Sequence, residues 1–177
     1  MKVIIVTGSV GSGKTTLAKR LSKKLDYEYI DISKLIEQEK ISYGYDKKMK
    51  CKLIDIKKLN KALIELIDNY KNSIIKNSNK KNKKIIEGIV IDSHLSHYLP
   101  KKYVDLCIVT KCDIKELNKR LKKRKYGGDK IRENIECEIF DICLNEAKEQ
   151  RHNLLVIDTT KGINMGDISK RVKRIIK

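Results

Sequence analysis

Long apolar runs are missing from this 177-residue chain. No stretch of the sequence approaches the ~18 consecutive apolar residues of a membrane-spanning helix. The apolar run at the N-terminus reaches only a few residues before Gly8 interrupts it, which argues against a signal peptide. We therefore expect a protein that does not enter a membrane and that resides in the cytoplasm, or in the nucleus if the source is eukaryotic.

Paired cysteine motifs are also missing. No two of the five cysteines form a CxxC pair, and no histidine lies beside them at zinc-ligand spacing. This pattern argues against a zinc site and favours reduced thiols in a cytosolic protein. The cysteines are Cys51, Cys107, Cys112, Cys137 and Cys143.

Acidic residues are scarce relative to basic ones. The chain has 41 Lys and Arg against 23 Asp and Glu, a formal net charge of +18, and a single proline, Pro100. Such a charge suits anionic partners such as nucleotides or RNA. Because the whole chain is rich in Lys, Ile and Asn, compositional bias is an equally simple explanation. The six lysines of Lys71–Lys84 favour a solvated loop over an RNA-binding patch.

A phosphate-binding motif follows the first predicted strand. Residues 1–6 are β-branched and apolar, 8–15 match GxxxxGK(S/T), and 16–25 form an amphipathic segment. The glycines let successive backbone N–H groups point inward, and the following helix adds its positive end. Lys14 supplies a cation for the outer phosphates, and the Thr15 hydroxyl can ligate Mg²⁺. The loop therefore predicts a nucleoside triphosphate site.

Strands and helices alternate five times along the chain. This order predicts an α/β fold with one domain over residues 1–177, in which helices cover both faces of a five-stranded parallel sheet. Residues 42–54 and 123–130 lack a clear period, and we expect mobile loops there. Strands are expected at 1–6, 27–32, 85–91, 103–109 and 154–157. Helices are expected at 16–25, 33–41 (capped by Ser33), 55–75 (capped by Asp55), 113–124 (capped by Asp113), 129–150 and 165–176.

Several polar residues are expected at the ligand-binding edge, where the parallel strands end. Asp92 ends an apolar strand and can hold Mg²⁺ or its water, although a loop-capping carboxylate is the simpler alternative. His94, two residues on, is either an ordinary loop histidine or a group that orients water or accepts a proton. Asp158–Thr160 follows another strand and is expected beside them.

Two arginines lie four residues apart before a glycine-broken turn. Arg120 and Arg124 therefore share one helical face, and guanidinium groups suit the charge on a transferring phosphoryl group. A basic helix end favoured by the dipole is the alternative. In the helix that follows, the apolar face is expected to contain Ile131, Ile135, Ile139, Ile142 and Cys143.

Thr110–Asp113 resembles the (N/T)KxD signature by which GTPases recognise guanine. A GTPase should also carry DxxG after its third strand, but this strand continues Asp92–Leu95 without a glycine. We therefore favour Asp113 as a helix N-cap over guanine recognition.

Five stretches, spread over nearly the whole chain, together match the motifs of one kinase family. They are Gly8–Leu21, Tyr43–Asp46 with the following Cys51, Val90–His94, Arg120–Tyr126 and Glu133–Phe140. On these motifs the sequence resembles the adenylate kinase isoenzyme six family, also described as nuclear adenylate kinases or CINAP-type ribosome-assembly ATPases. The resemblance implies a P-loop NTPase of the nucleoside monophosphate kinase type.

The resemblance also implies roles for particular positions. About 31–54 would form the monophosphate-binding region, and about 123–133 the lid. Asp92 and His94 would be the pair linked to Mg²⁺ and ATP hydrolysis, and Arg124 the lid arginine that contacts ATP. The ATP-binding positions would be Gly11, Gly13, Lys14, Thr15 and Thr16, to which Arg120 is added from its place beside Arg124.

The implied activity is Mg²⁺-dependent transfer of the ATP γ-phosphoryl group to AMP or another nucleoside monophosphate, with accompanying ATPase activity. The family also implies a role in small-subunit rRNA maturation, with pre-rRNA and a small-subunit platform protein as partners. Two alternatives are an ATP-hydrolysing assembly factor with little kinase activity and a kinase for a small metabolite. Glu37 stands where an arginine is expected, and Lys34 or Lys40 are the candidates to replace it.

Overall fold

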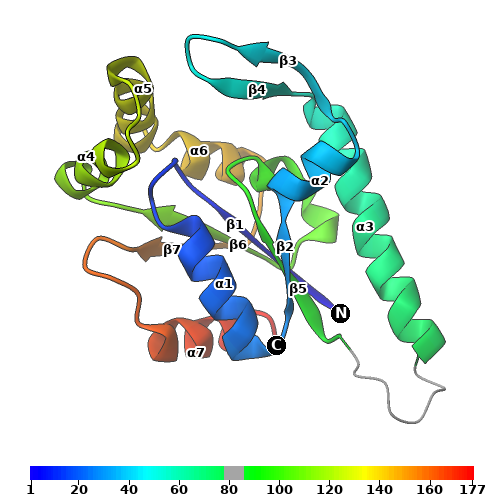
Figure 1. Ribbon diagram of the computed structural model, residues 1–177. Helices are drawn as coiled ribbons and strands as arrows, with labels where there is room; N and C mark the ends of the chain where they lie inside the picture. The colour runs from blue at the N-terminus through cyan, green and yellow to red at the C-terminus, as the bar shows by residue number, and fades with distance from the viewer. Residues whose placement is uncertain (78–85) are drawn as a thin grey trace.

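A five-stranded parallel sheet forms the centre of the computed structural model, which describes residues 1–77 and 86–177 (Figure 1). Its strand order is β2-β5-β1-β6-β7, and every neighbouring pair runs parallel. The five strands are β1 (Lys2–Thr7), β2 (Glu28–Asp31), β5 (Gly88–Asp92), β6 (Leu106–Lys111) and β7 (Leu154–Asp158). The predicted fold class is therefore confirmed, with β1 as the central strand.

Helices cover both faces of this sheet (Figure 1). They are α1 (Lys14–Leu25), α2 (Ile32–Gln38), α3 (Ile56–Asn77), α4 (Ile114–Lys123), α5 (Gly128–Ile139), α6 (Ile142–Glu149) and α7 (Met165–Ile175). Alternate residues of β1 enter the two cores, because strand side chains point to opposite faces. Ile4 packs with Leu17 of α1 and Val172 of α7, whereas Ile5 packs with Leu63 of α3.

A third, smaller apolar cluster joins α4 and α5 to the phosphate-binding loop. Leu117 and Leu121 of α4 are fully buried and pack with Ile131 and Ile135 of α5. Val10 of the loop joins the same cluster. The pair of helices is therefore fixed against the loop by apolar contact.

Residues 42–54 form a hairpin rather than the irregular loop that the sequence suggested. β3 (Ser42–Asp46) pairs antiparallel with β4 (Cys51–Ile54), and the register shifts between Ser42 and Gly44. The hairpin projects away from the main sheet (Figure 1). Its residues are mostly exposed on both sides, so no apolar alternation marks the strands in the sequence.

The helix predicted over residues 129–150 is broken in two. α5 ends at Ile139 and α6 begins at Ile142, with Asp141 between them at a φ of 54°. The predicted apolar face is wrong at the break, where Ile139 and Ile142 are exposed while Glu138 is buried. Because the end of α5 meets the polar loop and not the apolar core, a charged side chain points inward there.

Several predicted boundaries also move. Asp31, not Ser33, caps α2, since its carboxylate accepts the Ser33 N–H at 2.9 Å. A short 3₁₀ turn after Pro100 delays the start of β6 to Leu106. The first part of Lys71–Lys84 belongs to α3, while the part from residue 78 lies outside the described residues.

Two predicted helix caps are confirmed. The Asp55 carboxylate accepts the backbone N–H groups of Lys57 and Lys58, and Asp113 accepts those of Lys115 and Glu116. Within the described parts of the chain, no helix has the length and apolar character to cross a bilayer.

Candidate functional site

The phosphate-binding loop lies between the end of β1 and the start of α1. Gly8 and Gly13 have φ values of 138° and 93°, which side chains other than glycine rarely allow. A Cβ atom at Gly8 would lie 2.5 Å from the Thr110 carbonyl oxygen, so the neighbouring strand also excludes a side chain. The loop conformation therefore requires glycine, as a phosphate cradle built from backbone N–H groups does.

Lys14 is the first residue of α1 and folds back over the loop. Its Nζ donates to the Ser9 carbonyl oxygen at 2.8 Å. Burial lowers the pKa of Lys14, and the charge of Asp92 acts in the opposite direction. The ammonium group thus lies among the loop, α1 and the end of β5, where terminal phosphates of a bound nucleotide would need it.

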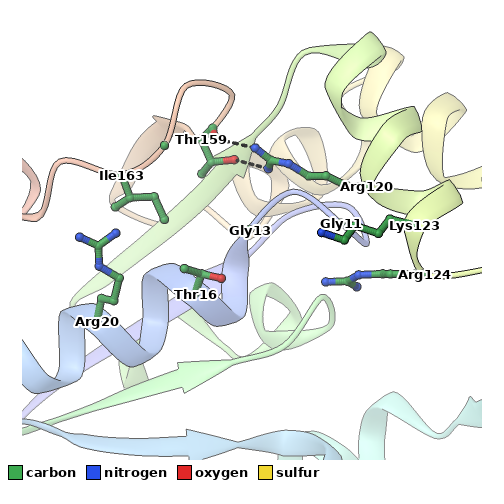
Figure 2. A pocket seen from close by; sticks show the side chains of 10 residues that line it. Gly11, Gly13, Thr16, Arg20, Arg120, Lys123, Arg124, Thr159 and Ile163 are labelled. Carbon is green, nitrogen blue, oxygen red and sulfur yellow. Dashed lines mark hydrogen bonds between the residues drawn. The ribbon is translucent and has the colours of Figure 1, made fainter.

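A cavity of about 440 Å³ opens beside the loop (Figure 2). This volume is within the range of small-molecule sites. Four cationic side chains line it: Arg20 of α1 and Arg120, Lys123 and Arg124 around the end of α4. The remaining lining residues are Gly11, Gly13, Thr16, Thr159, Gly162 and Ile163. The walls therefore suit a polyanion with an attached apolar group.

Arg120 ties three segments together at the rim of this cavity. Its guanidinium donates to the Thr159 carbonyl oxygen at 2.9 Å and to Thr159 Oγ1 at 3.3 Å (Figure 2). Its Nε also donates to Glu116 at 3.0 Å. Thr159 in turn donates to the Ser12 carbonyl oxygen at 2.6 Å. Arg120 therefore supports the loop through Thr159.

Arg124 is placed differently from Arg120. Figure 2 shows its side chain extending toward the phosphate-binding loop. It lines the large cavity and also a small one of about 60 Å³, which it shares with Lys14, Thr15 and Thr16. The structure thus brings together the predicted loop residues and the predicted lid arginine, which can offer its guanidinium to phosphate oxygens.

Asp92 and His94 lie at the end of β5. Asp92 is buried and accepts a hydrogen bond from Tyr29 Oη at 3.0 Å. Burial first, and then the Asp92 charge and this hydrogen bond, raise the pKa of Tyr29. Desolvation by the surrounding protein and then the Lys14 charge lower the pKa of His94 to about 4, although the residue stays exposed. His94 is therefore neutral near pH 7 and can exchange hydrogen bonds with water.

The oxygen donors near Lys14 fit a magnesium ion. Mg²⁺ prefers carboxylate, hydroxyl and phosphate oxygens, and proteins commonly hold it with one or two side chains plus the substrate. Asp92 and Thr15 supply one carboxylate and one hydroxyl. Among residues 1–77 and 86–177, no three His, Cys, Asp or Glu side chains form a metal-binding group. A metal here would therefore depend on substrate phosphates for most of its ligands.

A buried histidine network under the loop was not found by sequence reasoning. The ring of His97 contacts Thr7 Oγ1 at 2.7 Å and Glu146 at 2.9 Å, and Tyr98 Oη donates to Glu146 at 2.6 Å. His152 Nε2 lies 2.9 Å from the His97 carbonyl oxygen. The contacts join residues 48 or more positions apart, so no local pattern reveals them.

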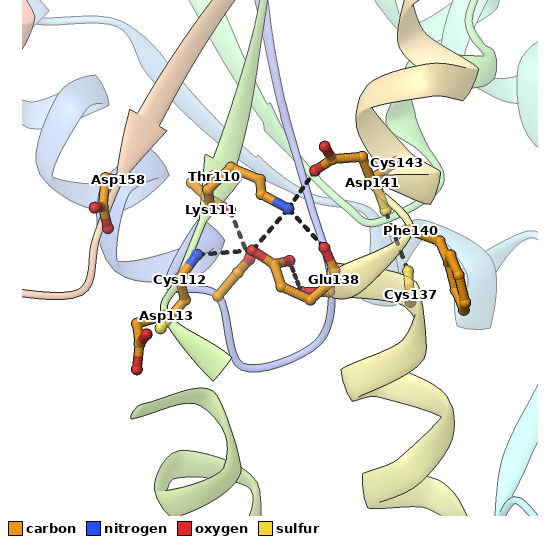
Figure 3. A network of polar contacts seen from close by, with 12 residues as sticks. Thr110, Lys111, Cys112, Asp113, Cys137, Glu138, Phe140, Asp141, Cys143 and Asp158 are labelled. Atoms are coloured by element: carbon orange, nitrogen blue, oxygen red, sulfur yellow. Dashed lines mark hydrogen bonds and ion pairs between the residues drawn. The ribbon is translucent and has the colours of Figure 1, made fainter. Parts of the chain in front are cut away.

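A second network joins the end of α5 to the phosphate-binding loop (Figure 3). The carboxylate of Glu138 accepts from Ser9 Oγ at 2.5 Å and from the Cys112 N–H at 2.7 Å. Lys111 lies 3.1 Å from the same carboxylate and also pairs with Asp141. Glu138 belongs to a motif noted in the sequence, but its role depends on the helix break that the sequence did not predict.

The parallel sheet, the glycine-rich loop and the cationic rim define a P-loop kinase. The fold is similar to that of a shikimate kinase from Acinetobacter baumannii, with a TM-score of 0.55 and 14% identity over 99% of this chain and 93% of that one. It is also similar to a deoxyadenosine kinase from M. mycoides, with a TM-score of 0.51 and 16% identity over the whole of both chains. At these identities the likeness concerns the fold alone.

Sequence comparison identifies the family. A family model described as an AAA domain matches residues 4–141. Adenylate kinase isoenzyme 6 homologs from Dictyostelium discoideum and Caenorhabditis elegans are 32% and 33% identical, over 88% and 82% of this chain and 79% and 72% of the relatives. The chain belongs to the adenylate kinase isoenzyme 6 family of AAA-domain nucleotide kinases. The resemblance drawn from the sequence motifs is thereby confirmed.

Proposed function

We propose that the protein transfers the γ-phosphoryl group of ATP to AMP in a Mg²⁺-dependent reaction. One observation carries the proposal: Lys14, Thr15 and Arg124 line a single small cavity at the mouth of the glycine loop. Adenylate kinase is also the name given to the relatives from Dictyostelium discoideum and Caenorhabditis elegans.

The cationic groups act on the phosphates. In the transfer, the bond from the γ-phosphorus to the ADP oxygen breaks while a phosphate oxygen of AMP forms the new bond. Lys14 and Arg124 offset the negative charge on the transferring group, and the loop N–H groups hold the ADP portion in place. Arg120 acts indirectly, by fixing Thr159 and through it the loop.

Magnesium would be held by Thr15 and Asp92 together with the substrate. When bound, the ion neutralises phosphate charge and orients the reacting oxygens. Tyr29 fixes the Asp92 carboxylate through its hydroxyl group. This arrangement leaves the carboxylate oriented before any substrate arrives.

The acceptor region of the proposal comprises α2 and the β3–β4 hairpin, within residues 31–54. Glu37 of α2 pairs with Lys52 of β4 at 3.0 Å, and both side chains are exposed. The Glu37 carboxylate therefore pairs with the Lys52 ammonium group, which could otherwise bind the AMP phosphate. Closure of residues 123–133 over the cleft would exclude water from the transfer.

ATP hydrolysis is the proposed side activity. His94 is neutral near pH 7 and follows Asp92 by two residues at the same sheet edge. It is therefore suited to orient a water molecule toward the γ-phosphate when AMP is absent. Replacing His94 with Ala should reduce ATP hydrolysis more strongly than transfer to AMP.

A role in small-subunit rRNA maturation is the second part of the proposal. The net charge of +18 supports contact with pre-rRNA, and a ribosomal platform protein is proposed as a further partner from the resemblance of the sequence motifs. We assign this role to the cytoplasm, or to the nucleus of a eukaryotic source. In the alternative in which the protein is chiefly a ribosome-assembly factor, ATP hydrolysis would accompany RNA binding and kinase activity would be slight.

An acceptor panel tests the catalytic proposal. Purified protein is supplied with γ-labelled ATP, Mg²⁺ and one acceptor at a time: AMP, other nucleoside monophosphates, shikimate as a small metabolite, or water. We expect labelled ADP with AMP as the fastest product. Label that appears only in inorganic phosphate would support the ATPase alternative, and label on shikimate would support the metabolite kinase.

A salt series tests the RNA proposal. Affinity for a small-subunit rRNA fragment is measured at increasing salt, and counterion release predicts a steep linear loss of log affinity. Lys14→Ala, which removes one charge from the site, is the matched control and should retain most of the affinity. Affinity that stays flat with salt would contradict the proposed RNA contact.

A further inference from the structure

Two cysteine side chains face each other across the break between α5 and α6. Cys137 and Cys143 have Sγ atoms 3.9 Å apart (Figure 3). In one continuous helix, side chains six residues apart point in directions about 120° apart around the helix axis. The break, with Asp141 at a φ of 54°, therefore brings the two thiols together.

These two thiols differ from the other three. Cys107 and Cys112 are buried, and burial raises the pKa of both, that of Cys107 to about 12. Cys51 is exposed on the hairpin. Cys137 and Cys143 are half-buried, so reagents can reach them while the protein holds them as a pair.

We propose that Cys137 and Cys143 are the site of a reversible intrachain disulfide that loosens the phosphate-binding loop. A disulfide bond is about 2.05 Å long, so the sulfur atoms need to approach by about 1.9 Å. The non-helical link between α5 and α6 permits this approach, because rotation at the link does not break a helical hydrogen-bond ladder. The site is not part of the ATP- or metal-binding positions described above.

The thiol chemistry assigns different roles to the two residues. The contact between the two thiols lowers the pKa of Cys137 and raises that of Cys143. Cys137 is therefore the attacking thiolate. With a small-molecule disulfide as oxidant, Cys137 forms a mixed disulfide and releases one thiolate. The Cys143 thiol then loses its proton and attacks the Cys137 sulfur, so that two small thiols and one protein disulfide result.

Glu138 connects this site to the phosphate-binding loop. It follows Cys137 directly and accepts hydrogen bonds from Ser9 and from the Cys112 N–H at 2.5 and 2.7 Å. Ser9 in turn accepts from Lys14 through its carbonyl oxygen. Pulling Cys137 toward Cys143 turns the end of α5 and moves the Glu138 carboxylate away from Ser9. The oxidised protein should therefore hold ATP more weakly.

Peptide mapping tests the disulfide without any reference to activity. The full chain carrying Cys51→Ser is equilibrated with oxidised and reduced glutathione, alkylated and digested with trypsin. Cleavage after Arg132 and Lys148 releases residues 133–148, which contain both cysteines and no other. We expect this peptide to lose two hydrogens and to escape alkylation, and reductant to reverse both changes.

A second variant provides the control, and two outcomes of the same peptide map would contradict the proposed disulfide. Cys143→Ser in the same background should leave a peptide in which Cys137 is either alkylated or bound to one glutathione, with no internal crosslink. The proposal fails if residues 133–148 keep two alkylated thiols in oxidising buffer, or if their crosslinks join separate chains.

ATP affinity tests the coupling, which rests on the proposed nucleotide function. Titration calorimetry should show severalfold weaker ATP binding by the oxidised Cys51→Ser protein than by the reduced one, and no such difference for the Cys143→Ser version. Equal affinities in the oxidised and reduced states would overturn the coupling. Absence of ATP binding by the reduced protein would refute the proposed function and the coupling together, while the peptide map would still decide the disulfide.

Discussion

At the scale of single residues, Lys14 interacts both with the phosphate-binding loop and with the end of β5. It donates to the Ser9 carbonyl oxygen, and its charge acts on both Asp92 and His94. Removing the ammonium group deletes a cation beside the transferring phosphate while leaving the glycine backbone intact.

Lys14→Ala should therefore lower kcat/KM for ADP formation on the order of a hundredfold, as loss of one preorganised donor does. Lys24→Ala, an exposed lysine in the last turn of α1, is the control and should change little. Steady-state assays with ATP and AMP make the comparison. Similar rates for the two variants would contradict the role of Lys14.

Arg120 and Arg124 should separate in their effects on stability. Arg120 holds Thr159 and Glu116, so Arg120→Ala should lower the melting temperature and the activity together. Arg124 is exposed beside the loop, so Arg124→Ala should lower kcat with little change in melting temperature. Thermal unfolding and steady-state kinetics on both variants test the difference. Equal destabilisation by the two changes would contradict it.

At the scale of elements, α2 and the β3–β4 hairpin meet through the Glu37–Lys52 pair. Exposed pairs contribute little to stability, so Glu37→Gln should leave the melting temperature nearly unchanged. The same change frees Lys52 and removes a negative charge, so the KM for AMP should fall severalfold. Glu39→Gln, an exposed neighbour at the end of α2, is the control. A KM for AMP that is unchanged in Glu37→Gln would contradict this assignment of the acceptor region.

The elements that the sequence predicted well are those with many buried apolar side chains, either on one face of a helix or on both faces of a strand. The periodic spacing of α3 and the apolar runs of β1 and β5 identify them directly, because burial selects their side chains. The hairpin and the α5–α6 break were missed for a related reason. Their conformation depends on exposed strands in one case and on the contact between Glu138 and the loop in the other.

At the scale of the whole molecule, two buried histidines link stability to pH. Burial lowers the pKa of His97, which Glu146 raises in part, and burial also lowers the pKa of His152. Each ring therefore binds its proton more readily in the unfolded chain, whose histidines have a pKa of about 6.5. Stability from these rings is complete above that value and is lost as the pH falls below it.

We therefore expect the melting temperature to fall between about pH 7 and pH 5, before most carboxylates titrate. In His152→Asn, which lacks the titrating ring, the fall should be shallower, although the variant is less stable at neutral pH. Scanning calorimetry across the pH range measures both slopes. A melting temperature that does not change over this interval, or equal slopes for the two proteins, would contradict the linkage.

The sequence by itself determined the sheet, the phosphate-binding loop and the family. Local sequence patterns predict each of these features. For example, a strand, a glycine loop and a helix follow one another within residues 1–25. Tertiary structure alone decided that Arg120 supports Thr159, that Glu138 supports Ser9 and that Cys137 faces Cys143. Those contacts form where separate strands end at one edge of the sheet and where the helix breaks between α5 and α6. No local pattern of side chains predicts either contact.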